Sequence, residues 1–423
     1  MNNYNFYETN IDWIGAIPDS WNFIRGRYLF KSKKEINKNL QCKNLLSLTL
    51  SGVLNKDYQS SEGLRPENYN TYQIFERNDL VFKMIDLENI KTSRVGIVHE
   101  KGIMSPVYIR HEPFTNLINP KFAYWFYFDL YKKNIYNNIG KGVRSSLTSS
   151  DLLDIKLPLP HLNEQKLISK FLNKKTQTID TLIKKIEKKI NLLKEQKTAL
   201  INLYVTKGLE PIIEKKDSGV EWIGEIPKHW ELKKLKYFTK IIYGISPSEK
   251  TYNYEGIGTI LINGPVEYSK EDFGETRAVK WTTEPTKIVP KGYLLFCLRG
   301  STTGRMNISH DEVSIGRGVC AIKSKFDQDF LVFAMMMIRI YIQDQLSGST
   351  FPSVTKDDVD NFKIPLPSFE EQKNISSFLK IKINNFNQYI ELYKKKIELL
   401  KEYRLSLISS VVTGKIRITE DMI

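Results

Sequence analysis

The chain has 423 residues, so two to four structural units are expected at roughly 100–200 residues per domain. Hydrophobic residues make up 41% and aromatic residues 12% of the sequence, which excludes a chain that is disordered throughout. The formal net charge of +15 favours a polyanionic partner, with nucleic acid first, although a solvated helix face is an alternative source of such charge.

The cysteine pattern and the apolar runs indicate a cytoplasmic protein. Cys42, Cys297 and Cys320 are odd in number and far apart, which argues against a disulfide scaffold and a cysteine-ligated zinc site. The start of the chain is polar, so no signal peptide is expected. The longest apolar runs, near residues 122–128 and 330–338, are shorter than the ~20 residues that a membrane span requires.

The chain repeats one plan. Residues 12–18 (Asp-Trp-Ile-Gly-Ala-Ile-Pro) with Trp21 recur as residues 221–227 (Glu-Trp-Ile-Gly-Glu-Ile-Pro) with Trp230, at an offset of 209. These tryptophans are interpreted as anchors that pack against a helix end. Because the stretch between the matched ends of each copy differs, two divergent globular segments are expected.

A second pair of matched blocks marks the start of two helical segments. Lys-Leu-Pro-Leu-Pro at 156–160 with Glu164-Gln165 recurs as Lys-Ile-Pro-Leu-Pro at 363–367 with Glu371-Gln372, now at an offset of 207. The predicted organisation is a globular segment at 1–160, a helical segment at 161–208, a second globular segment at 209–367 that opens with a linker at 209–219, and a second helical segment at 368–423.

Both helical segments carry apolar residues at alternating steps of four and three, which predicts a coiled-coil-like helix pair. The seam at the centre of the pair is expected to contain Ile183, Ile186, Ile190, Leu193, Lys197, Ile390, Tyr393, Ile397, Leu400 and Arg404. Its two basic residues, Lys197 and Arg404, stand at the same place in the two copies. They either fix the helix register or lie near a helix end and reach water.

The globular segments read as short strands, each followed by one late helix, which together with the helix pair gives an α+β protein. The first segment has predicted strands at 80–82, 95–98 and 106–109 and a helix at 120–131. The second has predicted strands at 257–262, 293–298 and 318–322 and a helix at 330–345. A Gly-rich turn follows each helix, at 140–146 and at 348–353.

No catalytic or metal site is predicted. Asn119-Pro120 resembles part of an amino-methyltransferase motif, but the second proline is absent and the pair suits a helix N-terminus. The run 300–305 lacks the spacing and the lysine of a phosphate-binding loop. The histidines show no metal-ligand or general-base spacing.

Loop cations and hydroxyls are the candidate DNA contacts, because Arg and Lys donate to guanine while Ser, Thr and Gly suit phosphates. The candidates are Lys83, Lys91, Arg94, Lys141, Arg144, Ser145, Arg299, Ser301, Thr302, Arg305, Arg317, Thr350 and Ser353. Ten of the fifteen net charges lie in the helical segments. The densest cluster, Lys184, Lys185, Lys188 and Lys189, is expected to face DNA phosphates or an acidic partner.

The doubled Trp-Ile-Gly-x-Ile-Pro blocks, the Pro-Leu-Pro-x-x-x-Glu-Gln helix starts and the two long helices resemble the specificity subunit of type I restriction–modification systems. The resemblance covers nearly the whole chain. It implies two target recognition domains separated by an antiparallel two-helix spacer, with an internal pseudo-two-fold repeat. Each domain would read one half of an asymmetric bipartite DNA target.

The resemblance also implies partners and cofactors. The helices would dock two methyltransferase subunits, and restriction subunits would join the complex. S-adenosylmethionine, ATP and magnesium would belong to those subunits, and this chain would have no cofactor and no catalysis of its own. A stand-alone bipartite DNA-binding protein is the alternative. An enzyme with its own nuclease or methyltransferase site is a third hypothesis, supported only by Asn119-Pro120.

Overall fold

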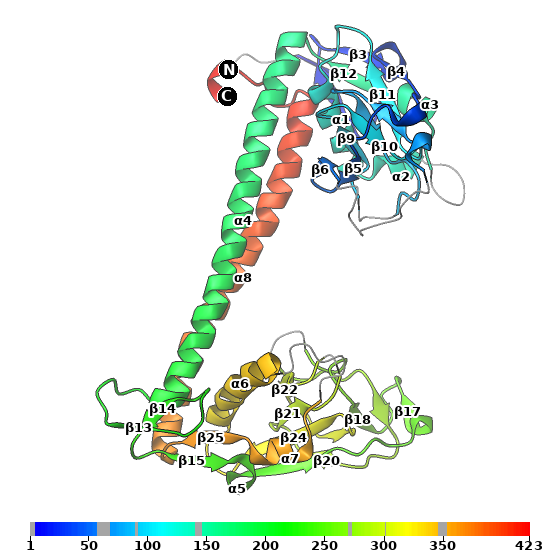
Figure 1. Cartoon of the computed structure of the whole chain (residues 1–423). Coiled ribbons are helices and arrows are strands. Elements are labelled where there is room, and N and C mark those ends of the chain that lie inside the picture. The colour runs from blue at the N-terminus through cyan, green and yellow to red at the C-terminus, as the bar shows by residue number, and fades with distance from the viewer. Residues whose placement is uncertain are drawn as a thin grey trace. The chain divides into compact units, whose positions relative to one another are not determined.

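The computed structural model describes residues 5–56, 68–88, 92–139, 146–269, 273–300, 302–345 and 353–423 (Figure 1). The chain divides into two compact units. Unit 1 comprises residues 1–187 and 394–423, and unit 2 comprises residues 188–393. The two long helices, α4 (Leu162–Lys207) and α8 (Phe369–Val412), each begin in one unit and end in the other.

Unit 1 is built around a four-stranded antiparallel sheet of order β4-β11-β8-β9. Its strands are β1 (Phe6–Glu8), β2 (Ala16–Pro18), β3 (Asn22–Arg25), β4 (Phe30–Ser32), β5 (Leu46–Thr49), β6 (Gly52–Asn55), β7 (Gln73–Phe75), β8 (Leu80–Phe82), β9 (Val95–Ile97), β10 (Gly102–Met104), β11 (Ile109–Pro113) and β12 (Lys156–Leu159). Its shorter helices are α1 (Pro120–Lys132), α2 (Ile135–Ile139) and α3 (Ser149–Asp154).

Unit 2 contains a four-stranded antiparallel sheet of order β16-β24-β21-β22 and a five-stranded sheet of order β17-β19-β18-β23-β20. Its strands are β13 (Lys215–Asp217), β14 (Glu225–Pro227), β15 (Glu231–Lys234), β16 (Thr239–Tyr243), β17 (Tyr252–Asn253), β18 (Thr259–Ile262), β19 (Trp281–Thr282), β20 (Ile288–Val289), β21 (Leu294–Cys297), β22 (Met306–Ile308), β23 (Val313–Ile315), β24 (Val319–Ser324) and β25 (Lys363–Leu366). Its shorter helices are α5 (Leu235–Phe238), α6 (Gln328–Gln345) and α7 (Lys356–Asn361).

The two units share one topology although their sequences diverge. Strands β4, β11, β8 and β9 of unit 1 have the same order and directions as β16, β24, β21 and β22 of unit 2. In each unit a helix, α1 or α6, follows the sheet, and a short helix with a Thr/Asp capping box, Thr148 with Asp151 or Thr355 with Asp358, comes later and precedes the last strand. The predicted α+β repeat is therefore confirmed.

Apolar burial holds each sheet against its helix. In unit 1 the β8 residues Leu80, Val81 and Phe82 have no exposed surface, and the ring of Tyr127 from α1 packs edge-on against Phe82 at 5.1 Å. In unit 2 Phe296 of β21 belongs to one buried cluster with residues of α6. Burying a large side chain of this kind contributes about 1.5–3 kcal/mol.

The glutamine of the Glu-Gln repeat motif explains how each long helix is joined to its unit. Gln165 is fully buried, and its Nε2 donates to the carbonyls of Leu117 and Pro160 at 2.8 Å each. Its Oε1 accepts the Asn119 N–H at 2.7 Å. Gln372 makes the corresponding bonds in unit 2, from Nε2 to the Pro367 carbonyl and from the Asp327 N–H to Oε1.

The predicted tryptophan anchors pack on helix ends. A Cβ on Gly208, at the end of α4, would approach the Trp230 ring to 3.1 Å. A Cβ on Gly414, just after α8, would meet the Trp21 ring at 3.1 Å and overlap Pro18. Both glycines have positive φ, as expected at a helix C-terminus, and their lack of a side chain admits the indole.

Three local predictions are resolved by the structure. The strand predicted at 106–109 is wrong, because Ser105–Tyr108 closes a turn and the strand is β11. The predicted linker at 209–219 contains strand β13, which pairs with β14 and whose residues are exposed. Asn119 is an N-cap whose side chain accepts the Lys121 and Phe122 N–H groups, which confirms the structural interpretation of the Asn-Pro pair.

In both units α4 and α8 run antiparallel. In unit 2 Lys197 contacts Asn387, and the rings of Tyr204 and Phe378 lie 4.7 Å apart, so residue numbers fall along α8 as they rise along α4. The predicted seam contains buried residues, Ile183, Ile186, Ile190, Ile390 and Ile397, and half-buried ones, Leu193, Lys197, Tyr393, Leu400 and Arg404.

Candidate nucleic-acid interface

The loop cations predicted for unit 2 come together beside one end of its central sheet. Just beyond β21, the Leu298 carbonyl accepts a 2.8 Å hydrogen bond from the Val354 N–H, and Arg299 forms a β-bridge with Ser353. The turn between β23 and β24 adds Arg317. These segments line one cavity of about 590 Å³. Three residues proposed from separate loops of the sequence therefore share one surface.

Close backbone packing fixes the position of Arg317. The Arg317 N–H donates to Ser246 Oγ at 3.2 Å. A Cβ on Gly316 would overlap Asn263 Oδ1, and a Cβ on Gly244 would overlap the Gly316 carbonyl. Because only glycine fits at these two positions, the exposed Arg317 side chain projects from a backbone with little freedom.

Two further residues of this cavity were missed by the sequence analysis. Lys356 begins α7, and its Nζ lies 5.0 Å from the centre of the Tyr243 ring. The Tyr243 hydroxyl donates to Asp360 at 2.6 Å and to the Lys356 carbonyl at 3.0 Å. Burial, followed by the Asp360 hydrogen bond, raises the pKa of Tyr243 above its usual range, so the hydroxyl stays a neutral donor.

Other candidates of unit 2 stabilise the loop rather than line the cavity. The Arg305 guanidinium is half-buried and donates to the Ser269 carbonyl at 2.6 Å. Thr302 is half-buried, and its hydroxyl lies 3.7 Å from Cys297 Sγ. These contacts connect the loop after β21 to its own unit.

Unit 1 repeats the same junction. Beyond β8 the Met84 carbonyl accepts a 3.0 Å bond from the Leu147 N–H, as the Leu298 carbonyl does from Val354 in unit 2. Lys83 stands at this junction, half-buried, with its Nζ 3.2 Å from Thr92 Oγ1. The junction beside Lys83 is the unit 1 counterpart of the cavity.

Arg94 does not fit the expected contact with DNA. It is 2% exposed, and its guanidinium donates to the carbonyls of Ile85 at 3.3 Å and Asp86 at 2.6 Å. Burial lowers its pKa. The guanidinium therefore stabilises the loop after β8 through these backbone hydrogen bonds and is not available to DNA. The candidates Lys91, Lys141, Arg144, Ser145, Ser301 and Thr350 lie outside the described residues.

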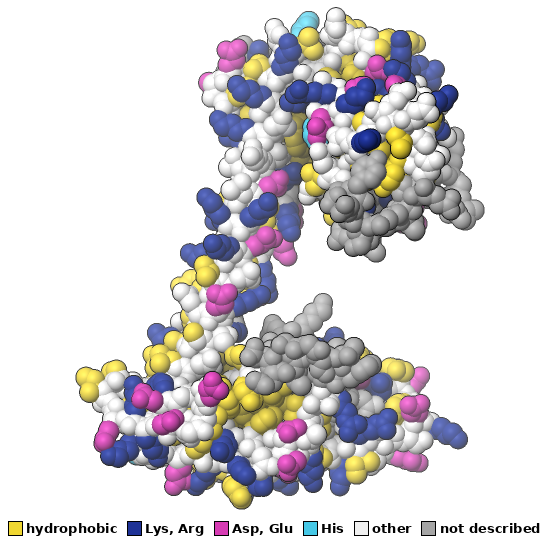
Figure 2. Space-filling view, viewed as in Figure 1, with side chains coloured by type: hydrophobic (Ala, Val, Ile, Leu, Met, Phe, Trp, Pro, Cys, Tyr) yellow, Lys and Arg dark blue, Asp and Glu magenta, His cyan; other side chains and the backbone are white. Residues whose placement is uncertain are grey.

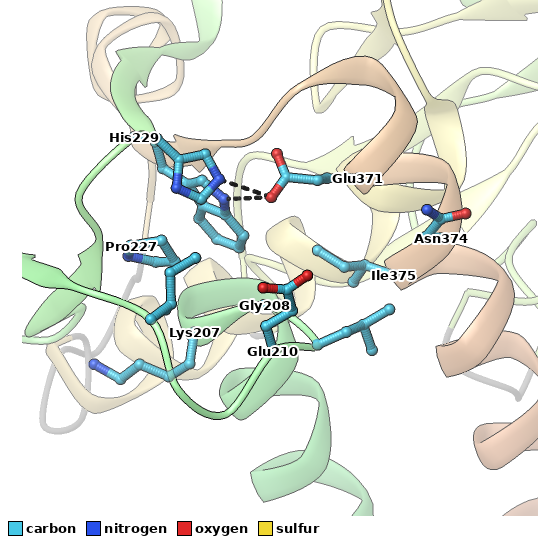
Figure 3. Close-up of a pocket in the computed structure, with 11 residues that line it drawn as sticks. Lys207, Gly208, Glu210, Pro227, His229, Glu371, Asn374 and Ile375 are labelled. Atoms are coloured by element: carbon cyan, nitrogen blue, oxygen red, sulfur yellow. Dashed lines mark hydrogen bonds and ion pairs between the residues drawn. The ribbon is translucent and has the colours of Figure 1, made fainter.

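A separate cavity of about 340 Å³ lies where α4 ends and α8 begins, within unit 2 (Figure 3). Glu371 Oε1 accepts from Trp230 Nε1 at 3.2 Å and lies 2.8 Å from His229 Nε2. Glu371 also forms a capping box with Ser368. Burial opposes ionisation, but the hydrogen bonds from His229, Ser368 and Trp230 lower the Glu371 pKa. The carboxylate is held as a helix cap.

The cluster of four lysines on α4 is solvent-exposed. Lys184, Lys185 and Lys188 are exposed, and so is Lys189, whose Nζ lies 5.5 Å from the Tyr393 ring centre. Figure 2 shows both basic and apolar side chains exposed along the helices. The exposed surface of the helices is thus suited to polar and apolar contacts alike.

Within the described part of the chain, no group of three His, Cys, Asp or Glu side chains is placed to hold a metal ion. Of the helices described, none is long and apolar enough to cross a membrane.

Two α+β units of one topology, joined by two long helices, define a protein built as an internal repeat. The family model for the type I restriction modification DNA specificity domain matches twice, at residues 21–192 and 227–402. The chain belongs to this family of DNA specificity subunits, which are non-catalytic.

Curated relatives and solved structures agree with this family. The chain is 33% identical to a protein of Methanocaldococcus jannaschii assigned as the type I restriction enzyme MjaX specificity subunit, over 98% of this chain and 97% of the relative. It is 29% identical to the MjaVIII specificity subunit of the same organism over 75% of each chain.

Two solved structures share the fold. A chain solved in work on the assembly and conformational transition of the type I R-M system matches with a TM-score of 0.77 and 17% identity, covering 95% of this chain and 99% of that one. The HsdS subunit from Thermoanaerobacter tengcongensis matches with a TM-score of 0.56 and 18% identity, covering 95% and 98%.

Proposed function

We propose that each unit reads one half of an asymmetric bipartite target in double-stranded DNA, and that unit 2 reads through the cavity beyond β21. The convergence of Arg299 and Arg317 there carries the proposal. Arginine bonds bidentately to guanine O6 and N7 in the major groove. Since the units share a topology but differ in their loops, they would prefer different half-sites.

Within this cavity Lys356 and Ser353 suit the phosphate backbone. Lys356 lies at the N-terminal end of α7, and its ammonium is positioned by the Tyr243 ring. Contacts of lysine with phosphates orient the protein on the duplex without reading sequence. Mutation of the arginines should therefore change the sequence preference, whereas mutation of the lysine should lower the affinity for every sequence.

The test compares substitutions in the cavity. Arg317→Ala should cost about 1–3 kcal/mol on the preferred duplex and relax the preference in one half-site only. Lys356→Ala should weaken binding to all sequences and reduce the salt slope by about one. Both are measured by selection from a randomised duplex library and by titration at several salt concentrations.

Arg277→Ala serves as the matched control, because Arg277 is exposed outside the cavity and its guanidinium donates to the Val266 carbonyl at 2.9 Å. The control should leave the preference unchanged. Loss of preference in both half-sites, or in neither, after Arg317→Ala would contradict the assignment of unit 2 to one half.

The helices are proposed to dock two methyltransferase subunits, which restriction subunits join. With the seam at heptad positions a and d, most of the exposed apolar residues fall at c and g, on one flank of each helix, with Ile381 and Leu405 of α8 among the exceptions. In unit 1 these are Leu182, Leu399 and Tyr403; in unit 2 they are Leu192, Leu203, Tyr389 and Leu392. Exposed apolar side chains gathered on one flank are characteristic of an interaction surface.

Methyl transfer with S-adenosylmethionine and magnesium-dependent ATP hydrolysis would then belong to the partner subunits. Family membership favours this subunit role over a stand-alone DNA-binding protein. Co-purification from the native host separates the two, since a stand-alone protein would bring down no methyltransferase. Leu399→Asp with Tyr389→Asp should abolish that co-purification while duplex binding by the chain persists.

A further inference from the structure

Each unit contains one polar pair across the helix seam. In unit 2 Lys197 Nζ donates to Asn387 Oδ1 at 3.1 Å. In unit 1 Arg404 Nε lies 3.0 Å from Asp180 Oδ1. The sequence repeat has an offset of 207, which relates Lys197 to Arg404 and Asp180 to Asn387. The two pairs are therefore the same contact, made once in each unit with the helices exchanged.

These cations are not at helix ends. Lys197 precedes the end of α4 at Lys207 by ten residues, and Arg404 precedes the end of α8 at Val412 by eight. The Arg404 side chain is 20% exposed and stacks at 5.7 Å over the Phe128 ring. A cation that is enclosed in this way depends on its partner, so the helix-end interpretation is not supported.

We infer that the pairs Lys197–Asn387 and Arg404–Asp180 fix the register of the antiparallel helices. In both pairs the two residue numbers add up to 584, which defines the observed register. An apolar seam alone repeats every seven residues and tolerates a slide of one heptad, whereas a polar residue in the seam selects one register.

The sequence opposes both slides. A slide of one heptad places Lys197 opposite Lys380 in one direction and Lys394 in the other. Two lysines would then face each other at a half-buried position, where like charges are destabilising. The slide toward Lys394 gives Arg404 an alternative partner, Glu187, but that gain is accompanied by the lysine clash.

The acceptors oppose the slides as well. Asp180 would face Ile397 or Val411, and Asn387 would face Ile190 or Tyr204. Each acceptor would lose its polar partner across the seam, and the apolar side chain opposite would offer none. The observed register is the one in which each of the four polar residues has a polar partner.

Under the proposed bipartite reading, the helix register also determines the spacing between the two half-sites. A heptad slide moves one helix along the other by about 10.5 Å, or roughly three base-pair steps of 3.4 Å. The four residues would thus be positioning residues for the length of the target spacer.

The test replaces all four by leucine in the full chain: Lys197→Leu, Asn387→Leu, Asp180→Leu and Arg404→Leu. The four positions are half-buried or exposed, and leucine has a helix propensity at least as favourable as the residues it replaces, so the helices should persist by circular dichroism. The matched control changes the exposed repeat-equivalent residues Gln177→Leu, Asn384→Leu, Thr181→Leu and Gln388→Leu, which lie outside the seam and the lysine cluster.

Register is read by bis-maleimide crosslinking of introduced cysteines. The native register is reported by Tyr204→Cys with Phe378→Cys, whose rings are 4.7 Å apart. One slide is reported by Tyr204→Cys with Asn385→Cys, and the other by Lys189→Cys with Phe386→Cys. In the leucine variant the slid products should rise about tenfold over wild type and over the control.

Native-register crosslinking alone in the leucine variant would overturn the inference. If that variant does not fold, a charge exchange provides the test. Asp180→Arg with Arg404→Asp should keep the native register, while Asp180→Arg alone should not. Equal native-register crosslinking in the exchange variant and the single variant would also overturn the inference. Crosslinking needs no DNA, so it is independent of bipartite reading. If the leucine variant selects targets from a duplex library with spacers altered by about three base pairs, the four residues also set the spacer length.

Discussion

The buried glutamine of each helix start offers a sharp test of how the long helices are attached. Gln165→Ala removes two donors and one acceptor and leaves the carbonyls of Leu117 and Pro160 and the Asn119 N–H without this partner. A buried polar group left unsatisfied costs about 1–3 kcal/mol. Partial hydration of the site limits the sum, so about 3–5 kcal/mol is expected.

Gln372→Ala should cost less, about 2–4 kcal/mol, because Gln372 makes two of these bonds and one is long, at 3.3 Å. Urea unfolding followed by hydrogen exchange measures each unit separately. Gln177→Ala is the control, since Gln177 is exposed on α4 and should change stability by less than about 0.5 kcal/mol. Equal losses for Gln165→Ala and Gln177→Ala would refute the reasoning.

Three further predictions concern pH, DNA binding and backbone packing. Burial lowers the pKa of His111 to about 4, so this histidine contributes stability that is present above pH 6.5 and is lost as pH falls through 4. His111→Gln should flatten that dependence in thermal unfolding at pH 4–7. Asp79, whose pKa burial raises to about 6, has the opposite slope between about pH 4 and 6 and serves as the internal comparison; an unchanged pH profile would contradict the histidine assignment. Neutralising Lys184, Lys185, Lys188 and Lys189 together should weaken binding to all duplexes alike and flatten the salt dependence, while an unchanged slope in titrations would assign these lysines to a protein partner or to solvent. Gly316→Ala should displace Asn263 and reduce binding to one half-site as Arg317→Ala does, whereas an unchanged library selection would show that the Arg317 loop tolerates the methyl group.

The long helices and the repeat were predictable from sequence because their information is local and periodic. The 4-3 spacing predicts which residues of α4 and α8 are buried, and the burial of Ile183, Ile190 and Ile397 follows it. Matched blocks at fixed offsets predicted two equivalent units, and the equal strand orders of the two sheets confirm this. The structural role of Asn119-Pro120 was likewise a local capping pattern.

The strand at Ile109–Pro113 was misplaced because its sequence, Ile-Arg-His-Glu-Pro, is mostly polar although two of its polar residues are buried. Arg110 and His111 are both buried, with Arg110 Nε 2.5 Å from Asp79 Oδ2 and His111 2.9 Å from the Ser149 hydroxyl. A buried polar residue is recognised as such only through its partner, and the partners come from other elements.

The positive charge by itself favoured nucleic acid and a set of loop cations, but it could not sort them. Tertiary structure buried Arg94 beneath its own loop and gathered Arg299, Arg317 and Lys356 around one cavity. It also matched Lys197 with Asn387 and Arg404 with Asp180. The physical reason is that periodicity determines which face of an element is apolar, whereas the polar contacts that decide a cation's role are made by residues distant in sequence.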